Sequence, residues 1–175
     1  PMIYLFFFIV FLLVFFASVS DNVTIGGSIG NVYRNAPNVI TTYSIIMTLF
    51  GLLFAAAFFN SSALRDHKNN FQEIIFSKPI NKFGYFIGKF SASLLLSTIP
   101  ITAVFFAVVI GSKIAPLMGW IEPERYGPLY FKTFLSNYFI FILPNMFIGG
   151  AIIYSLAQLF KNTTVSFVGA MLILV

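Results

Sequence analysis

The residues that could carry chemistry are few and unevenly distributed. The 175-residue chain has ten Lys and Arg, five Asp and Glu, one His and no Cys. Without Cys, and with His67 as its only imidazole, it offers no disulfide or thiolate zinc site and little means of activating a nucleophile. The sequence therefore predicts a protein that is not an enzyme, with no catalytic residue, metal site or cofactor of its own.

The composition of the chain indicates the class of protein to which those few residues belong. Hydrophobic residues make up 59% of the chain and Asp, Glu, Lys and Arg only 9%, against about 45–50% and about 25% in soluble domains. So little charge excludes a soluble globule. The chain opens without an initiator Met and stops inside an apolar run, so we expect a fragment of a longer membrane protein.

Long uncharged runs predict an all-α transmembrane helix bundle. Four runs reach or approach the ~20 residues that a helix needs to cross a bilayer, and a fifth is cut by the chain end. The predicted spans are residues 2–19, 39–60, 90–111, 133–159 and 164–175. The first run also resembles a secretory signal ending at Ser18-Val19-Ser20, but it lacks a basic leader and further spans follow, which favours a true span.

The distribution of Lys and Arg predicts the sidedness of the loops. Six basic residues fall on one predicted side, namely Arg65, Lys68, Lys78, Lys82, Lys89 and Lys161, and four on the other, namely Arg34, Lys113, Arg125 and Lys132. Because basic loops stay in the cytoplasm, the 60–89 loop is predicted to be cytoplasmic. Basic residues interleaved with apolar spans also indicate the lipid bilayer, and not nucleic acid, as the partner.

The 60–89 loop has the most structured pattern in the chain. Apolar residues from Leu64 to Ile75 recur at helical spacing, which predicts an amphipathic helix over residues 61–77 with Ser61 or Ser62 as its N-cap. Ser77-Lys78-Pro79 would end this helix in a sharp turn, and Asn81 would cap the helix that enters the third span. Such a surface helix is either merely solvated at the interface or a docking element for a cytoplasmic partner.

The two predicted outer connections have a different character. Residues 21–38 are rich in Gly, which favours turns. Residues 113–132 carry Trp120, Tyr126 and Tyr130, aromatic side chains that are typical of the headgroup level and are interpreted as interface anchors in preference to a ligand-stacking site.

The spans themselves contain no Asp, Glu, Lys, Arg or His. Intramembrane ionisable groups are the usual mark of ion coupling, so ion-driven transport is disfavoured. Pro100 and Pro144, with Asn145 beside the latter, interrupt two spans and are candidate helix hinges. Static packing is the preferred interpretation, because Pro is commoner in membrane helices than in soluble ones. The pairs Gly84/Gly88 and Ala151/Ser155 have the spacing that allows close helix approach.

Several short motifs resemble those of a known transporter family. In the loop these are Arg65-Asp66, Glu73-Ile74-Ile75, Pro79-Ile80-Asn81-Lys82 and Gly88-Lys89; elsewhere they are Asn35-Ala36-Pro37, Gly127-Pro128 and Leu143-Pro144-Asn145. Their order resembles type-2 permeases of ATP-binding-cassette (ABC) transporters, in particular a bacterial subgroup sometimes fused to an aminopeptidase-like domain. Asn81 stands where the family usually has Ser, which keeps the capping chemistry.

The resemblance implies a permease domain in the bacterial inner membrane with most of a six-span core. It implies that ATP is bound and hydrolysed by a separate ATP-binding subunit, and that a second permease copy completes a homo- or heterodimer. It places Arg65, Asp66, Glu73, Pro79 and Lys89 at the coupling site for that subunit. The substrate and the direction of transport stay open. The alternatives are a membrane anchor for a fused enzyme domain and a passive channel.

Overall fold

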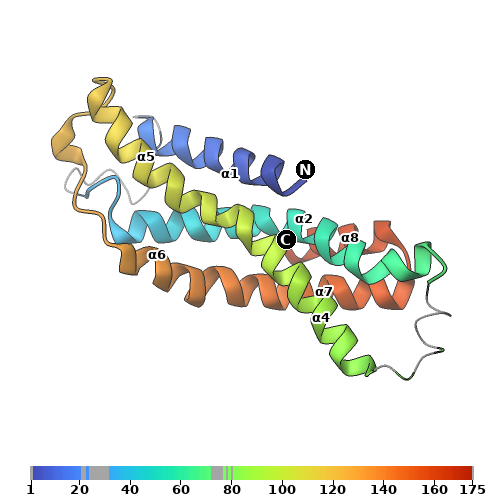
Figure 1. The fold of residues 1–175 in the computed structure, drawn as a ribbon. Helices are drawn as coiled ribbons and strands as arrows, with labels where there is room; N and C mark the ends of the chain where they lie inside the picture. Colours follow the sequence, from blue (N-terminus) through green and yellow to red (C-terminus); the bar gives the residue numbers. More distant parts are fainter. Residues whose placement is uncertain are drawn as a thin grey trace. The chain divides into compact units, whose positions relative to one another are not determined.

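The predicted fold class is confirmed by a computed structural model, which describes residues 2–20, 23, 32–71, 77, 79 and 81–174. Most of these residues are helical, and none of them forms a strand (Figure 1). Helices suit this composition because each one satisfies its backbone hydrogen bonds internally, as an apolar environment requires.

Four helical stretches are long and apolar enough to cross a bilayer, at 18, 32, 36 and 30 residues. They are α1 (Met2–Val19); α2 (Pro37–Lys68); α4 (Lys82–Thr98), the 3-10 stretch η1 (Ile99–Thr102) and α5 (Ala103–Leu117); and α6 (Phe131–Asn137), the π-helical stretch η3 (Tyr138–Ile142) and α7 (Leu143–Phe160). The 3-10 turn η2 (Pro123–Arg125) and the helix α8 (Thr163–Leu174) complete the described elements. This is the architecture of a multi-pass membrane protein.

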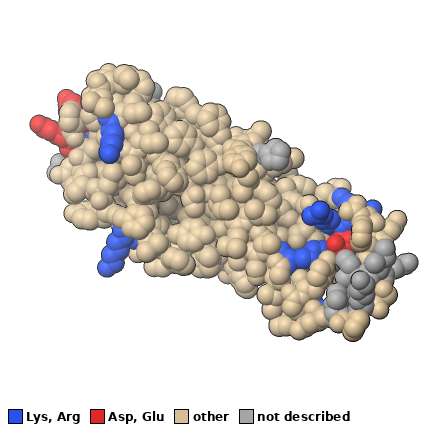
Figure 2. Space-filling view, in the orientation of Figure 1, with Lys and Arg blue, Asp and Glu red and all other residues tan. Residues whose placement is uncertain are grey.

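The chain divides into two compact units. Unit 1 comprises Pro1–Thr48 and Ile99–Pro144, and unit 2 comprises Leu49–Thr98 and Asn145–Val175. All four basic residues assigned by sequence to the outer side belong to unit 1, and all six assigned to the cytoplasmic side belong to unit 2. Across the described surface in Figure 2, Lys, Arg, Asp and Glu form small groups in each unit, and most of that surface carries none of them.

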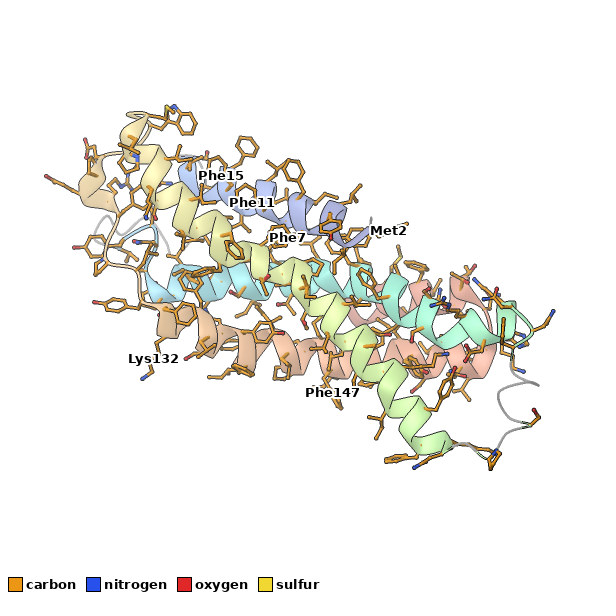
Figure 3. The ribbon with its side chains drawn as sticks, in the orientation of Figure 1. Met2, Phe7, Phe11, Phe15, Lys132 and Phe147 are labelled. Carbon is orange, nitrogen blue, oxygen red and sulfur yellow. The ribbon has the colours of Figure 1, made fainter. Side chains whose placement is uncertain are left out.

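In unit 1, α1 packs along α5. Phe7, Phe11 and Phe15 follow one another along α1 (Figure 3), and the Phe7 ring lies 6.0 Å from that of Phe106. At the other end of this pair, a Cβ on Gly111 would collide with the Ser18 hydroxyl, so glycine is what allows the two helices to approach. Tight packing of this kind holds membrane helices together, because lipid supplies no hydrophobic force between them.

The two predicted outer connections are joined in unit 1. The buried Asn35 side chain donates to Gly127 O at 2.6 Å and accepts from Gly127 N at 2.7 Å. Its two bonds bring together two of the motifs that carry the family resemblance. Tyr126 donates to Ser18 O at 2.9 Å, so this aromatic residue ties α1 to the connection, whereas Trp120 is 53% exposed, in keeping with the predicted anchor.

In unit 2 an aromatic cluster packs α2, α4 and α7 together. The Phe59 ring lies 5.2 Å from Phe90 and 6.4 Å from Tyr154, and Phe90 lies 5.4 Å from Phe147. The helices α2 and α4 run in opposite directions, since Ser62 bonds to Lys89 and Asp66 to Tyr85. The helices α2 and α7 run in the same direction, since Leu52 meets Gly149 and Ala63 meets Gln158. The last turn of α2 therefore meets the start of α8, where Lys68 Nζ donates to Thr163 at 3.1 Å.

The prediction of a new helix beginning at Ser61 or Ser62 is wrong. The helix α2 continues through both serines to Lys68, because the segment contains no Gly or Pro to break it. It ends in a Schellman cap, where Asn70 adopts a positive φ of 56° and Phe71 N donates to Asp66 O at 2.9 Å. Of the predicted 60–89 loop, residues 60–68 and 82–89 are thus helical, and residues 72–76 lie outside the described part.

The predicted N-cap at Asn81 is confirmed. Its side-chain oxygen accepts from the backbone N–H groups of Phe83 at 3.1 Å and Gly84 at 3.2 Å. These are the second and third residues of α4, whose amides have no partner within the helix.

We expect Asn81→Ala to lower the free energy of unfolding by about 1 kcal/mol, since the two amides lose their acceptor. Asn81→Ser restores an acceptor of the right reach and should recover most of the loss. Thermal unfolding of the purified protein in detergent, followed by circular dichroism, measures both. Equal loss in the two variants would contradict a capping role.

Candidate functional site

Three polar side chains tie α2 to α4 at the base of the 69–81 segment. Asp66 Oδ2 accepts from Lys89 Nζ at 2.6 Å and from the Tyr85 hydroxyl at 2.6 Å. Asp66 belongs to the last turn of α2, while Tyr85 and Lys89 lie one turn apart on α4 and therefore share a face of that helix. We call these three residues the Asp66 clamp.

The clamp is shielded from water. The side chains of Lys89 and Asp66 are only 16% and 18% exposed, so their ion pair is stronger than a pair on the surface. Lys89 Nζ also lies 5.3 Å from the centre of the Tyr85 ring, which is within the range of a cation–π contact. Ser62 reinforces the junction because its hydroxyl donates to Lys89 O at 3.2 Å. The chain that leaves α2 and the chain that enters α4 are therefore held at a fixed separation.

The remaining predicted coupling residues have different surroundings. Arg65 is exposed one residue before Asp66, and its charge acts on that carboxylate. Pro79 is exposed and outside any helix, in keeping with the turn that is predicted at this residue. Glu73 lies outside the described residues. The structure thus brings Asp66 and Lys89 together, and it leaves the coupling role of the whole set as a prediction.

The candidate hinges coincide with departures from α-helical geometry. Pro100 is buried in the 3-10 stretch η1, and Pro144 follows the π-helical stretch η3, where Leu143 N donates to Tyr138 O. Asn145 is exposed. The division between the two units falls at the same places, between Thr98 and Ile99 and between Pro144 and Asn145.

Two contributors to the junction are not identified as site residues by sequence reasoning. Tyr85 lies within the helix predicted to follow Asn81 and has no assigned role there, and Ser62 is interpreted as a helix cap. The available clue was that Asp66 and Lys89 have opposite charges and flank the same segment. A further bond joins α7 to α2, because the Gln158 side chain donates to Ala63 O at 3.3 Å.

A comparison of the chain with protein-family models, with curated proteins and with solved structures finds no match. The function is therefore inferred from the residues and their geometry.

Proposed function

We propose that this chain is the membrane-spanning part of an ABC transporter permease, which moves a substrate across a bacterial inner membrane by using ATP hydrolysed on a separate subunit. The observation that carries the proposal is the Asp66 clamp. It joins two long helices at the base of the segment that bears the family motifs. In this proposal the segment faces the cytoplasm and docks on the ATP-binding subunit.

Mechanical coupling needs a rigid joint, and the clamp supplies one. A force on the docked segment reaches α2 and α4 together only if the two helix ends cannot separate. The ion pair, the tyrosine bond and the bond from Ser62 each oppose separation. Asp66 and Lys89 are therefore assigned to the joint. Arg65, which is exposed, and Glu73, which bears one of the family motifs, are assigned to contacts with the subunit.

Two further features support an external source of energy. The predicted spans hold no Asp, Glu, Lys, Arg or His with which to couple an ion gradient. The chain also lacks the Gly-rich Lys-Ser/Thr loop that cradles nucleotide phosphates. Pro100 and Pro144 are the positions where α4–α5 and α6–α7 would bend as the substrate path opens, and a second permease copy would complete that path.

The test is the ATPase activity of the full-length protein reconstituted with its candidate ATP-binding subunit. Glu73→Ala should weaken co-purification and lower ATP hydrolysis at least threefold, because an acidic contact with the subunit is lost. Glu124→Ala is the matched control, since Glu124 is an exposed acidic residue in unit 1; it should leave both readouts unchanged.

Two outcomes would overturn the proposal. If the protein neither binds the subunit nor changes its ATP hydrolysis, a membrane anchor for an attached enzyme domain is the better interpretation. If the reconstituted protein conducts ions in a bilayer without ATP, it is a passive channel. An unchanged Glu73→Ala variant in an otherwise active complex would remove Glu73 from the docking surface.

A further inference from the structure

An open cavity lies beside the Asp66 clamp, within unit 2. Its volume is about 710 Å³, and its lining comes entirely from α2 and α4. The contacts within the Asp66 clamp and within the aromatic cluster are made without any group in this cavity. The cavity is large enough to hold part of a small amphiphile.

The lining changes from charged to apolar along the cavity. The two helices run in opposite directions, so residues near the end of α2 lie beside residues near the start of α4. Arg65 and Lys89 line the end nearest the helix termini, whereas Phe58 and Leu96 line the end farther into the span. From Gly84 to Leu96 the axis of α4 advances about 18 Å at roughly 1.5 Å per residue.

The charged end is suited to an anion. Two cations and one carboxylate line it, which leaves a net positive charge. Lys89 has three ammonium protons, of which Asp66 engages one. Arg65 is exposed and presents five N–H donors, enough for a phosphate on the cavity side and for another acceptor outside it. The exposed Ser61 hydroxyl adds a further donor.

We propose that this cavity binds an anionic phospholipid, with the phosphate at Arg65 and Lys89 and an acyl chain against Phe58 and Leu96. A free phosphate ion would use only the charged end. A zwitterionic lipid would bring its own cation next to Arg65. On the predicted topology the lipid comes from the cytoplasmic leaflet, where basic pockets between helices meet anionic headgroups.

The experiment uses the full-length protein without the ATP-binding subunit, so that its failure is separate from failure of the proposed transport function. Binding is measured by native mass spectrometry with phosphatidylglycerol, with phosphatidylcholine of the same acyl chains, and with soluble glycerol phosphate. We expect phosphatidylglycerol to bind at least tenfold more tightly than either of the others.

Variants locate the site. Arg65→Gln should weaken binding of phosphatidylglycerol about tenfold, and Arg65→Lys, which keeps the charge, should retain most of it. Lys132→Gln removes an exposed cation from unit 1 (Figure 3) and should change nothing. Equal binding of the two lipids, binding of glycerol phosphate as tight as that of the lipid, or an unaffected Arg65→Gln variant would each overturn the proposal.

Discussion

Replacing Asp66 by alanine is expected to destabilise the protein and, under the permease function proposed above, to uncouple ATP hydrolysis from transport. The change leaves Lys89, which is only 16% exposed, without its anion, and leaves the Tyr85 hydroxyl without its acceptor. We expect a loss of about 2 kcal/mol, which is less than the roughly 3–5 kcal/mol for breaking a fully buried pair, because this charge is only partly buried. Thermal unfolding in detergent measures the first effect, and transport by the reconstituted complex measures the second.

A double-mutant cycle tests whether Asp66 and Lys89 stabilise the protein through their contact with each other or only through their separate packing. Lys89→Met alone should cost about as much as Asp66→Ala, but the double variant should cost less than the sum by about 1 kcal/mol or more, because neither charge is then left unpaired. Lys132→Met, in unit 1, is the control for loss of a lysine charge. Additive losses would show that the two residues do not act together, and would remove the structural basis of the proposed joint.

The second large effect is expected at Gly150, on α7. A Cβ at this position would overlap the ring of Phe59, which is fully buried and held by Phe90 at 5.2 Å. Since the ring has no free space to enter, Gly150→Val should lower the stability by about 3 kcal/mol, the upper end of the usual cost of overpacking. The same unfolding measurement in detergent tests it.

Gly88→Val is the matched control, because a Cβ at Gly88 meets no atom within 4 Å. Valine is slightly better than glycine in a helix, so this variant should stay within about 0.5 kcal/mol of the wild type. Phe59→Leu should relieve part of the loss in the Gly150→Val background, since a smaller side chain makes room. A Gly150→Val protein as stable as the wild type would mean that α7 and α2 are not in close contact at this position.

The glycines show where pattern alone was insufficient. The spacing of Gly84 and Gly88 predicts close helix approach, yet Gly88 faces open space and the nearest atoms to a Cβ on Gly84 belong to Asn81, in the turn just before α4. Close approaches between helices include Gly111, facing Ser18, and the neighbouring Gly149 and Gly150, facing Leu52 and Phe59. A spacing of four residues places two glycines on one face of a helix, but which face meets a neighbour depends on how the helices pack.

The 60–89 loop likewise combines a local interaction that the sequence predicts with a long-range one that it does not. The cap at Asn81 was predictable, because an Asn side chain reaches amides only two and three residues away. The role of Ser62 was not, because its hydroxyl donates to Lys89 O, 27 positions along the chain. The sequence pattern correctly predicted a cluster of polar residues after Ser61, but it did not predict that α2 would continue through them.

The sequence by itself determined the class of molecule: scarce charge and uncharged runs of span length require helices in a membrane, whatever their arrangement. It also determined the cap at Asn81 and the sites where Pro100 and Pro144 disturb a helix, since those interactions reach only a few residues. The tertiary structure decided that Asp66 meets Tyr85 and Lys89, that Asn35 meets Gly127, and which glycines admit a neighbouring helix. Such pairings depend on the relative rotation and depth of packed helices, which nearly uniform apolar surfaces leave unspecified.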